Sequence, residues 1–443
     1  MTPHPPDSLA NAFHALRLTE RTDGPVELVA RLDLLKRLEV AVLGAKERIV
    51  QAAAADFGAR SREETLFGEV LGVVSALRHA HRHVRRWSRP RRVPVGAPFW
   101  PAKAWLVPQP LGLVGIMSPW NYPFLLALSP LVGALAAGNR AMLKPSEHTP
   151  RVAAEIAQLL DRSLGQTIVR TVEGGPTIAR AFASLRFDHL IFTGSTARGR
   201  EVAMAAAANL VPVTLELGGK CPAIVLPDAD LDAAASAIVT GKGLNAGQTC
   251  IAPDHVLLAG VPGDRFRAAL EAAVQRHFPD GLTTRIIPHR AGQFGGPEGM
   301  LQIVVDPPPS SPLVTEEVFG PVLPIHALPD LDAALDRLRD QDSPLAVYLF
   351  SRDPQAERRV LQGTRAGALV VGGTIVQAAI DELPFGGLGA SGMGRYHGQA
   401  GFDALSNLKA HVRTPRFSLA SLGQPPYGKF TAKLLAHLLP DPK

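Results

Sequence analysis

The chain has 443 residues, of which 46% are hydrophobic and 19% are charged, and its formal net charge is +6. This composition is that of a soluble globular protein and excludes a disordered or low-complexity chain. Because a single hydrophobic core stops growing at about 250–300 residues, the length predicts two domains.

The first ninety residues predict two long amphipathic helices, because apolar residues recur at helical spacing over 26–57 and again over 63–87. Seven arginines crowd the end of this region: Arg78, Arg82, Arg85, Arg86, Arg89, Arg91 and Arg92. They could bind nucleic acid or a membrane surface, but we expect the solvated end of a helix followed by a linker. His79 and His83 lie one helical turn apart, but no third ligand stands at a plausible spacing, so we expect no metal site.

Residues 102–119 alternate around a Pro-Gly turn and predict a hairpin that leads into a buried strand. Helices and strands alternate after it. We expect helices at 125–137, 151–164 and 178–183 and strands at 141–143, 168–172 and 189–192. Such alternation predicts a parallel sheet with helices on both faces. A second α/β series runs from about residue 221 to 376, and strand-like and helical segments return after residue 400.

Two motifs of the first series follow predicted strands. In PWNYP (119–123) two prolines bracket Asn121, whose amide could stabilise an oxyanion or simply belong to a turn. In NRAMLKPSE (139–147) Lys144 and Glu147 stand at the carboxyl end of a strand, the edge at which open α/β sheets bind ligands. They could contact a ribose and a phosphate, or form a solvated pair at a helix start.

A third motif, FTGSTARG (192–199), takes a strand into a turn that opens a helix. The free N–H groups at such a helix start favour a phosphate, although an ordinary helix cap is the alternative. The motif lacks the G-x-G-x-x-G spacing of the common dinucleotide fingerprint.

The second series begins with an acid and a cysteine that could work together. Glu216 in LELGGK is a carboxylate in an apolar strand, where burial would raise its pKa toward that of a general base near neutrality. Cys250 in NAGQTC stands among small residues that allow a tight turn and an exposed thiol. Taken singly, the first could be an ion-paired Glu and the second a buried structural Cys.

Two later segments, EEVFGPVLP (316–324) and LPFGGLGASGMGRYHG (383–398), face either a ligand or the solvent. The six glycines of the second imply close backbone contacts.

Taken together in their order and spacing, PWN, KPSE, FTGST, LELGGK, GQTC and EEVFGPV resemble the aldehyde dehydrogenase superfamily over about residues 28–428. GASGMGRYHG and the PPYG at 425–428 are most similar to its class 3 and coniferyl aldehyde dehydrogenase branch. The resemblance implies an α/β fold with a Rossmann-type parallel-sheet cofactor domain (1–216), which carries an oligomerisation hairpin at 98–113. It also implies an α/β catalytic domain (217–400) and an oligomerisation strand with a C-terminal tail (401–443).

The resemblance also implies a mechanism and an NAD(P) cofactor. Cys250 would attack the aldehyde, Asn121 and the Cys250 backbone N–H would hold the oxyanion, and Glu216 would activate the water that hydrolyses the thioester. The cofactor would contact Trp120, Lys144, Ser146, Glu147, Gly175, Phe192, Thr193, Gly194, Ser195, Leu217, Gly218, Glu317 and Phe319. Glu147 should repel a 2′-phosphate, so we expect NAD, with NADP possible.

The expected substrate is an aromatic or medium-chain aldehyde, and the only expected macromolecular partner is a second copy of the chain. By the resemblance, a homodimer would form through the hairpin at 102–113 and the strand near 409–413. Two cysteines and the absence of a signal-peptide pattern predict a cytoplasmic protein.

One segment departs from the family pattern. Cys250 and Glu317 are 67 positions apart, closer than the resemblance implies, and the loss falls within 278–300. A catalytically impaired, dinucleotide-binding protein is therefore an alternative, and a thiol-dependent esterase is a minor one. We expect an active enzyme, because a scaffold has no chemical use for Cys250, Glu216 and Asn121 together.

Overall fold

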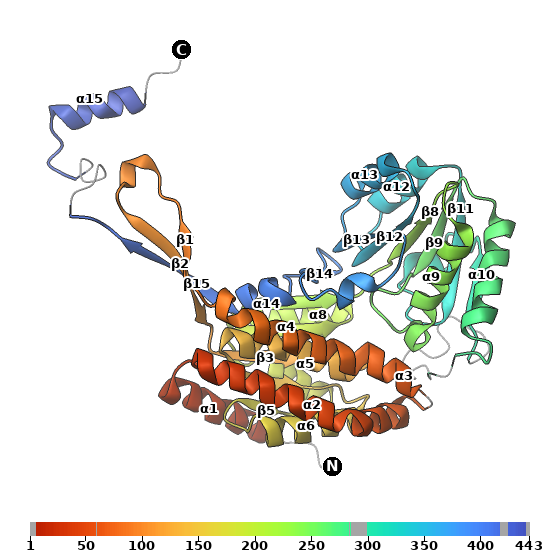
Figure 1. Ribbon diagram of the computed structural model, residues 1–443, viewed down its shortest axis with the longest axis horizontal. Coiled ribbons are helices and arrows are strands. Elements are labelled where there is room, and N and C mark those ends of the chain that lie inside the picture. The colour runs from red at the N-terminus through yellow and green to blue at the C-terminus, as the bar shows by residue number, and fades with distance from the viewer. Residues whose placement is uncertain (1–5, 59, 283, 285–298, 417–423, 440–443) are drawn as a thin grey trace.

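The computed structural model describes residues 6–58, 60–282, 284, 299–416 and 424–439. Figure 1 shows two bodies, each with a sheet between helices, and a thin arm of strands that leaves the molecule on one side. The two large sheets have six strands each, and the arm has three.

The first sheet has the strand order β14-β7-β6-β3-β4-β5. Its strands are β3 (Leu113–Met117), β4 (Arg140–Lys144), β5 (Val169–Thr171), β6 (His189–Gly194), β7 (Val213–Leu217) and β14 (Gly392–Met393). Neighbours are parallel except for β14 and β7. This confirms the predicted parallel sheet, with the expected strand positions shifted by no more than two residues.

Helices cover both faces of this sheet. One layer contains α2 (Leu28–Phe57), α4 (Leu71–Trp87), α5 (Pro123–Ala137) and α6 (Pro150–Ser163), and the other contains α1 (Pro6–Asp23), α7 (Pro176–Ala183) and α8 (Thr196–Ala207). Because side chains alternate along a strand, Val114 and Ile116 of β3 pack against the first layer, and Leu113 and Met117 against the second.

The second sheet is parallel throughout and has the order β10-β11-β9-β8-β12-β13. Its strands are β8 (Pro222–Val225), β9 (His255–Ala259), β10 (Gln302–Val305), β11 (Val322–Leu328), β12 (Ala346–Phe350) and β13 (Ala368–Val371). One face packs against α9 (Leu231–Gly243) and α10 (Gly263–His277), and the other against α12 (Leu331–Arg339) and α13 (Pro354–Gly363). The fold class predicted from the sequence is therefore confirmed.

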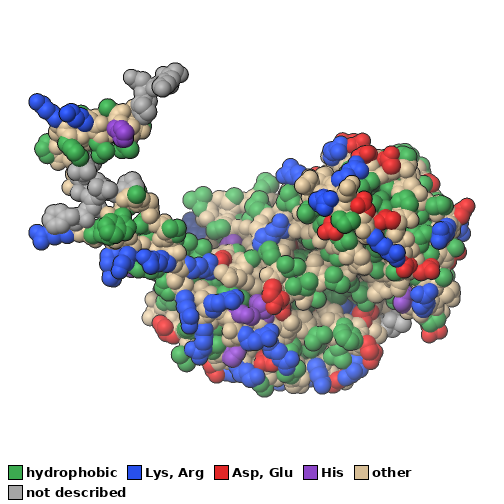
Figure 2. Space-filling view, turned by 45° about the horizontal axis from the view of Figure 1, so that its top comes forward, with side chains coloured by type: hydrophobic (Ala, Val, Ile, Leu, Met, Phe, Trp, Pro, Cys, Tyr) green, Lys and Arg blue, Asp and Glu red, His purple; other side chains and the backbone are tan. Residues whose placement is uncertain are grey.

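The arm corrects the expected hairpin. β2 (Lys103–Pro110) pairs antiparallel with β1 (Arg91–Val93) and β15 (Ser406–Arg413), not with the buried strand β3 that follows it. Every residue of β3 is buried and none of β2 is, so the turn at Gly112 carries the chain from the arm into the core. Beyond the arm lies α15 (Lys429–Leu438), none of whose residues is buried (Figure 2).

Other local predictions are refined at the N-terminal end. The sequence analysis missed α1, although its buried Leu9, Phe13 and Leu16 stand at helical spacing. The expected helix at 63–87 is divided into α3 (Arg62–Thr65), the π-helical turn η1 (Leu66–Val70) and α4. The remaining short helices are η2 (Ala97–Phe99), η3 (Leu244–Gly247), α11 (Pro312–Thr315), η4 (Val376–Ala379) and α14 (Gly398–Ala404).

Two arginines of the basic cluster make structural ion pairs, Arg78 with Glu39 at 2.7 Å and Arg91 with Asp403. The His79 and His83 rings pack at a tilt of 42°, with centroids 4.3 Å apart. In the described part of the chain, no three His, Cys, Asp or Glu side chains are grouped to hold a metal ion. Nor does any described helix have the length and apolar character needed to cross a bilayer. Most of the shortened 278–300 segment lies outside the described residues.

Candidate active site

A pocket of about 860 Å³ lies along the carboxyl ends of β3, β4, β6 and β7 and reaches the loops of the second sheet. Asn121, Glu216 and Cys250 all line it, and so do all the residues expected to bind the cofactor except Gly175. Gly175 is the N-cap of α7, next to Pro176, which does line the pocket. The structure thus gathers in one place residues that lie up to about two hundred positions apart in the sequence.

Cys250 follows a short segment of unusual backbone. Asn245, Ala246 and Gly247 all have positive φ angles, of 51°, 52° and 76°. A side chain at Gly247 would lie 2.2 Å from the Gly320 carbonyl oxygen, so this position requires glycine. Left-handed conformations cost free energy in non-glycine residues, and they persist here because the loop is held from several sides.

The loop that carries Asn121 is one of these supports. Asn121 Nδ2 donates to the Gln248 carbonyl at 3.1 Å, and Asn245 Nδ2 donates to the Asn121 carbonyl at 2.8 Å. The Tyr122 hydroxyl lies 2.9 Å from Thr249 Oγ1. Because an amide group has two N–H donors, Asn121 keeps one for a ligand in the pocket.

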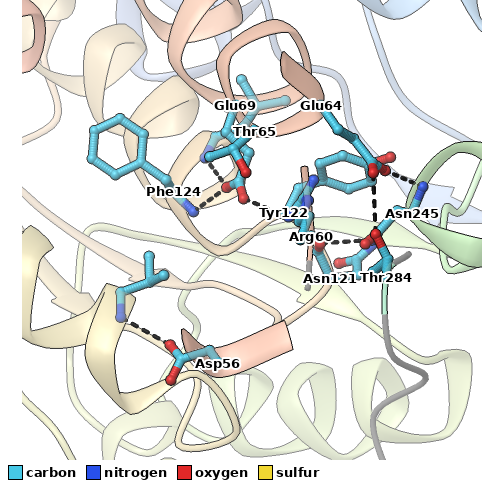
Figure 3. A network of polar contacts seen from close by, with 12 residues as sticks. Asp56, Arg60, Glu64, Thr65, Glu69, Asn121, Tyr122, Phe124, Asn245 and Thr284 are labelled. Atoms are coloured by element: carbon cyan, nitrogen blue, oxygen red, sulfur yellow. Dashed lines mark hydrogen bonds and ion pairs between the residues drawn. The ribbon is translucent and has the colours of Figure 1, made fainter. Parts of the chain in front are cut away.

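A buried ion pair lies next to the Asn121 loop and supports it (Figure 3). Arg60 Nη1 and Glu69 Oε1 lie 2.7 Å apart, and both side chains are fully buried. The other Glu69 oxygen accepts hydrogen bonds from the backbone N–H groups of Phe124 and Leu125, in the first turn of α5. Glu69 thereby satisfies donors that a helix start leaves unpaired, directly after the Asn121 loop.

Two further contacts join this support to the cysteine loop. The Arg60 guanidinium lies over the Tyr122 ring, 4.9 Å from its centroid. From α3, Glu64 accepts hydrogen bonds from the Asn245 backbone N–H and from Thr284 Oγ1 (Figure 3). The helical segment 60–69 therefore holds both loops that border Cys250.

Glu216 lies in β7, and its side chain is buried against the pocket. The residue is 3% exposed, and neither carboxyl oxygen has a hydrogen-bond partner among the described residues. Burial raises its pKa well above the ordinary value of a glutamate, and the charge of Arg395 opposes this shift. The direction of this shift is the one predicted from the sequence.

The Cys250 thiol is protonated in this environment. Burial raises its pKa to about 12, and the negative charges of Glu317 and Glu216 act in the same direction. The thiol must therefore lose its proton as it attacks a substrate, which requires a base nearby.

At the other end of the pocket, the residues fit a dinucleotide. Lys144 is 4% exposed, and its ammonium group contacts Glu147 Oε2 at 3.0 Å. Burial alone would raise the pKa of Glu147, but its backbone N–H and Lys144 lower it, so the carboxylate is ionised at neutral pH. Ser195 begins α8 without capping it, which leaves the first-turn N–H groups of that helix to a phosphate.

Between the two ends, Trp120 and Phe319 meet edge to face, with ring centroids 5.6 Å apart. The Glu317 carboxylate lies against Gly218, where a side chain would approach Oε2 to 2.3 Å. The first glycine of LELGG therefore leaves room for the Glu317 side chain beside it.

The sequence profile of the aldehyde dehydrogenase family matches residues 11–283 and 295–411. The chain belongs to the aldehyde dehydrogenase family. The profile is interrupted within the same 278–300 segment that the sequence analysis identified as shortened.

Several aldehyde dehydrogenases are similar over nearly the full length. The coniferyl aldehyde dehydrogenase of Pseudomonas sp. strain HR199 is 40% identical over 98% of this chain and 96% of its own. A substrate-bound structure of Staphylococcus aureus AldH is 33% identical and has a TM-score of 0.92, with 97% and 99% of the two chains covered. An NAD-dependent aldehyde dehydrogenase from Sinorhizobium meliloti is 26% identical, with a TM-score of 0.83 over 94% and 89%. The chain is thus an oxidoreductase that oxidises aldehydes with NAD or NADP, the reaction of its family.

This aldehyde dehydrogenase holds its 316–319 loop with buried charges that the sequence analysis missed. Lys220 Nζ lies 2.5 Å from Asp254 Oδ1 and donates to the Glu316 carbonyl at 2.7 Å. The Val318 backbone N–H donates to Asp254 Oδ2 at 2.6 Å, and the Val318 carbonyl accepts from Lys242 at 3.0 Å. Of these charged residues, only Lys220 could have been noticed in the sequence, because it directly follows LELGG.

Substitution of Asp254 should loosen this loop. Asp254→Asn removes the anion beside the partly buried Lys220 and the buried Lys242, so we expect the free energy of unfolding to fall by about 3 kcal/mol. We also expect the KM for NAD to rise by about tenfold, because the loop carries Glu317 and Phe319. Urea unfolding and steady-state kinetics measure the two effects.

The matched control is Glu271→Gln, which breaks an exposed ion pair with Arg267 (2.8 Å) on α10. It should cost less than about 0.5 kcal/mol. Equal effects of the two variants would contradict the role assigned to the Asp254 cluster.

Proposed function

We propose that Cys250 is the nucleophile, Glu216 the base and Asn121 the oxyanion donor of this aldehyde dehydrogenase. The observation that carries the proposal is that all three side chains line one pocket whose far end suits a dinucleotide. Glu216 is buried and Cys250 is partly buried, so charges near them interact more strongly than in water.

The proposed reaction has two halves. In the first, the Cys250 sulfur bonds to the aldehyde carbon as its proton passes to Glu216, and the carbonyl oxygen becomes an oxyanion. Asn121 Nδ2 and the Cys250 backbone N–H donate hydrogen bonds to that oxyanion. NAD held by Lys144, Glu147 and Phe319 would supply the hydride acceptor, and loss of hydride from the same carbon would leave a thioester on Cys250.

The second half returns the enzyme to its starting state. After its proton has left for solvent, Glu216 removes a proton from a water molecule, whose oxygen attacks the thioester carbon. The C–S bond then breaks, the carboxylic acid leaves, and the Cys250 sulfur takes up a proton. The thioester divides one difficult oxidation into two easier steps.

Replacement of the nucleophile tests this scheme. Cys250→Ala should lower NADH formation by at least about a thousandfold, because the residual rate no longer proceeds through a covalent intermediate. The melting temperature and the Kd for NAD should stay close to those of the wild type. Residual dehydrogenase activity near the wild-type level would refute the role of Cys250.

The same assay separates the two alternatives. A wild-type protein that binds NAD but turns over no aldehyde would support the catalytically impaired, dinucleotide-binding protein. Ester cleavage without hydride transfer would support the thiol-dependent esterase.

We propose that the cofactor-binding domain is residues 1–216 and that it prefers NAD to NADP. The support for this preference is the ionised Glu147 at the end of β4, which would accept the ribose hydroxyls of NAD and repel the 2′-phosphate of NADP. The other contacts are those named from the family resemblance, including Gly175, Thr193 and Leu217. The substrate class we favour is an aromatic aldehyde, since similar chains are coniferyl aldehyde dehydrogenases.

Neutralising Glu147 should change the cofactor preference. In Glu147→Gln the repulsion is removed, so the ratio of kcat/KM for NADP to that for NAD should rise by about tenfold. Steady-state kinetics with each cofactor measure the ratio. Glu155→Gln, at a glutamate outside the pocket, is the control and should leave the ratio unchanged. An unchanged ratio in Glu147→Gln would show that the charge of Glu147 does not set a preference for NAD over NADP.

We further propose a cytoplasmic homodimer. Both cysteines are free thiols, which is typical of a reducing compartment. The exposed strands of the arm, β2 and β15, offer a surface for a second copy of the chain. Sedimentation should give twice the 47.1 kDa mass of one chain, and cell fractionation tests the location.

A further inference from the structure

The proposed function requires Glu216 to be ionised when it activates water, although its carboxyl is buried. A fully buried carboxyl with no hydrogen-bond partner holds its proton tightly, and a protonated carboxyl cannot act as a base. Both Glu216 oxygens are buried and have no hydrogen-bond partner within the described part of the chain. Something in the pocket must favour the ionised form if Glu216 is to activate water near neutral pH.

Arg395 is a positive charge brought next to Glu216 by strand pairing. In the glycine-rich segment, β14 pairs antiparallel with β7, with Gly392 opposite Glu216 and Met393 opposite Leu215. Arg395 follows two residues later. Its guanidinium is drawn inside the protein, because Nη1 is buried and has no hydrogen-bond partner among the described residues.

A glycine keeps the space between the two side chains open. A side chain at Gly386 would lie 2.8 Å from Glu216 Oε1 and 3.1 Å from Arg395 Cδ. The carboxyl and the arginine side chain therefore border the same small space, which any other residue at position 386 would fill. Gly386 has a φ of 153° and also lies against the Gly394 carbonyl, so the segment is closely packed here.

The other titratable groups near Glu216 are neutral around pH 7. They are the thiol of Cys250 and the phenol of Tyr396, and burial raises the pKa of each. Among these neighbours, Arg395 is thus the one whose charge can stabilise a carboxylate, and it opposes the effect of burial on the pKa of Glu216.

We propose that Arg395 is a positioning residue for the base: its guanidinium stabilises the Glu216 carboxylate and so sets the pH range in which the acyl-enzyme is hydrolysed. The proposal rests on the proposed function of Glu216. It adds that the base depends on a charge supplied by the glycine-rich segment 383–398, which the sequence analysis could describe only as ligand-facing or superficial.

Hydrolysis of p-nitrophenyl acetate tests the proposal without the dehydrogenase step. The burst of p-nitrophenol reports acylation of Cys250, and the slower steady-state rate reports hydrolysis of the acyl-enzyme. In Arg395→Met the side chain keeps an unbranched stem and loses its charge. The acidic limb of the pH profile of the steady-state rate should therefore move to higher pH by at least about one pH unit. The rate at pH 7 should fall by up to about tenfold, and the burst should keep its amplitude.

Arg395→Lys is the matched control, because it keeps the positive charge, and its acidic limb should stay close to that of the wild type. If Arg395→Met does not fold, as judged by melting temperature and NAD binding, Arg395→Gln carries the same expectation. An unchanged limb in the uncharged variant would overturn the proposal. So would equal shifts in the Lys and Met variants, since the role would then be one of shape.

Glu216→Gln separates this proposal from the proposed function. One outcome is that Glu216→Gln loses the steady-state phase while Arg395→Met keeps the acidic limb of the wild type. That result would leave Glu216 as the base and refute only the role assigned to Arg395. A wild-type steady-state phase in Glu216→Gln would instead refute the proposed function itself.

Discussion

The chemistry of this aldehyde dehydrogenase depends on one constraint, the placement of a buried carboxyl and a partly buried thiol in the same pocket. In water the Glu216 carboxyl would be ionised and a poor base, and its burial raises the pKa toward the range in which it can take and release protons. The same burial keeps the Cys250 thiol protonated until a substrate arrives. Each group is therefore useful only beside the other, and the fold must hold both.

The fold brings the two groups together because hydrogen bonds join the Asn121 loop of the first sheet to the loop that carries Cys250. Glu216 is held rigidly in β7, between β6 and β14, while Cys250 lies on a loop with left-handed backbone. That loop cannot keep its conformation alone, and the amides of Asn121 and Asn245 tie it to the first sheet. The buried Arg60–Glu69 pair then fixes the start of α5, into which the Asn121 loop leads. A buried ion pair adds little net stability, but it holds one arrangement, which is what a catalytic site needs.

The sequence predicted the parts of the site that follow directly from strand ends and short motifs. Asn121, Lys144, Ser195 and Gly218 each follow or end a parallel strand, so their common edge could be inferred before the structure was known. The partner of β2 could not be inferred, because an exposed strand carries no pattern that distinguishes β15 from β3. The roles of Arg60, Asp254 and Arg395 were also missed: a charged residue in a sequence predicts a solvated surface, and only packing over long sequence distances shows that it is buried.

The central claim is that Glu216 hydrolyses a thioester formed on Cys250. Rapid mixing of Glu216→Gln with NAD and an aromatic aldehyde tests it most directly, with mass spectrometry of the quenched protein. We predict a burst of one equivalent of NADH per active site, followed by little turnover, and a peptide containing Cys250 that carries the acyl group. The burst should be slower than in the wild type, because the thiol proton must then pass to water in place of Glu216. Steady NADH formation at the wild-type rate, with no acyl group on Cys250, would contradict the account.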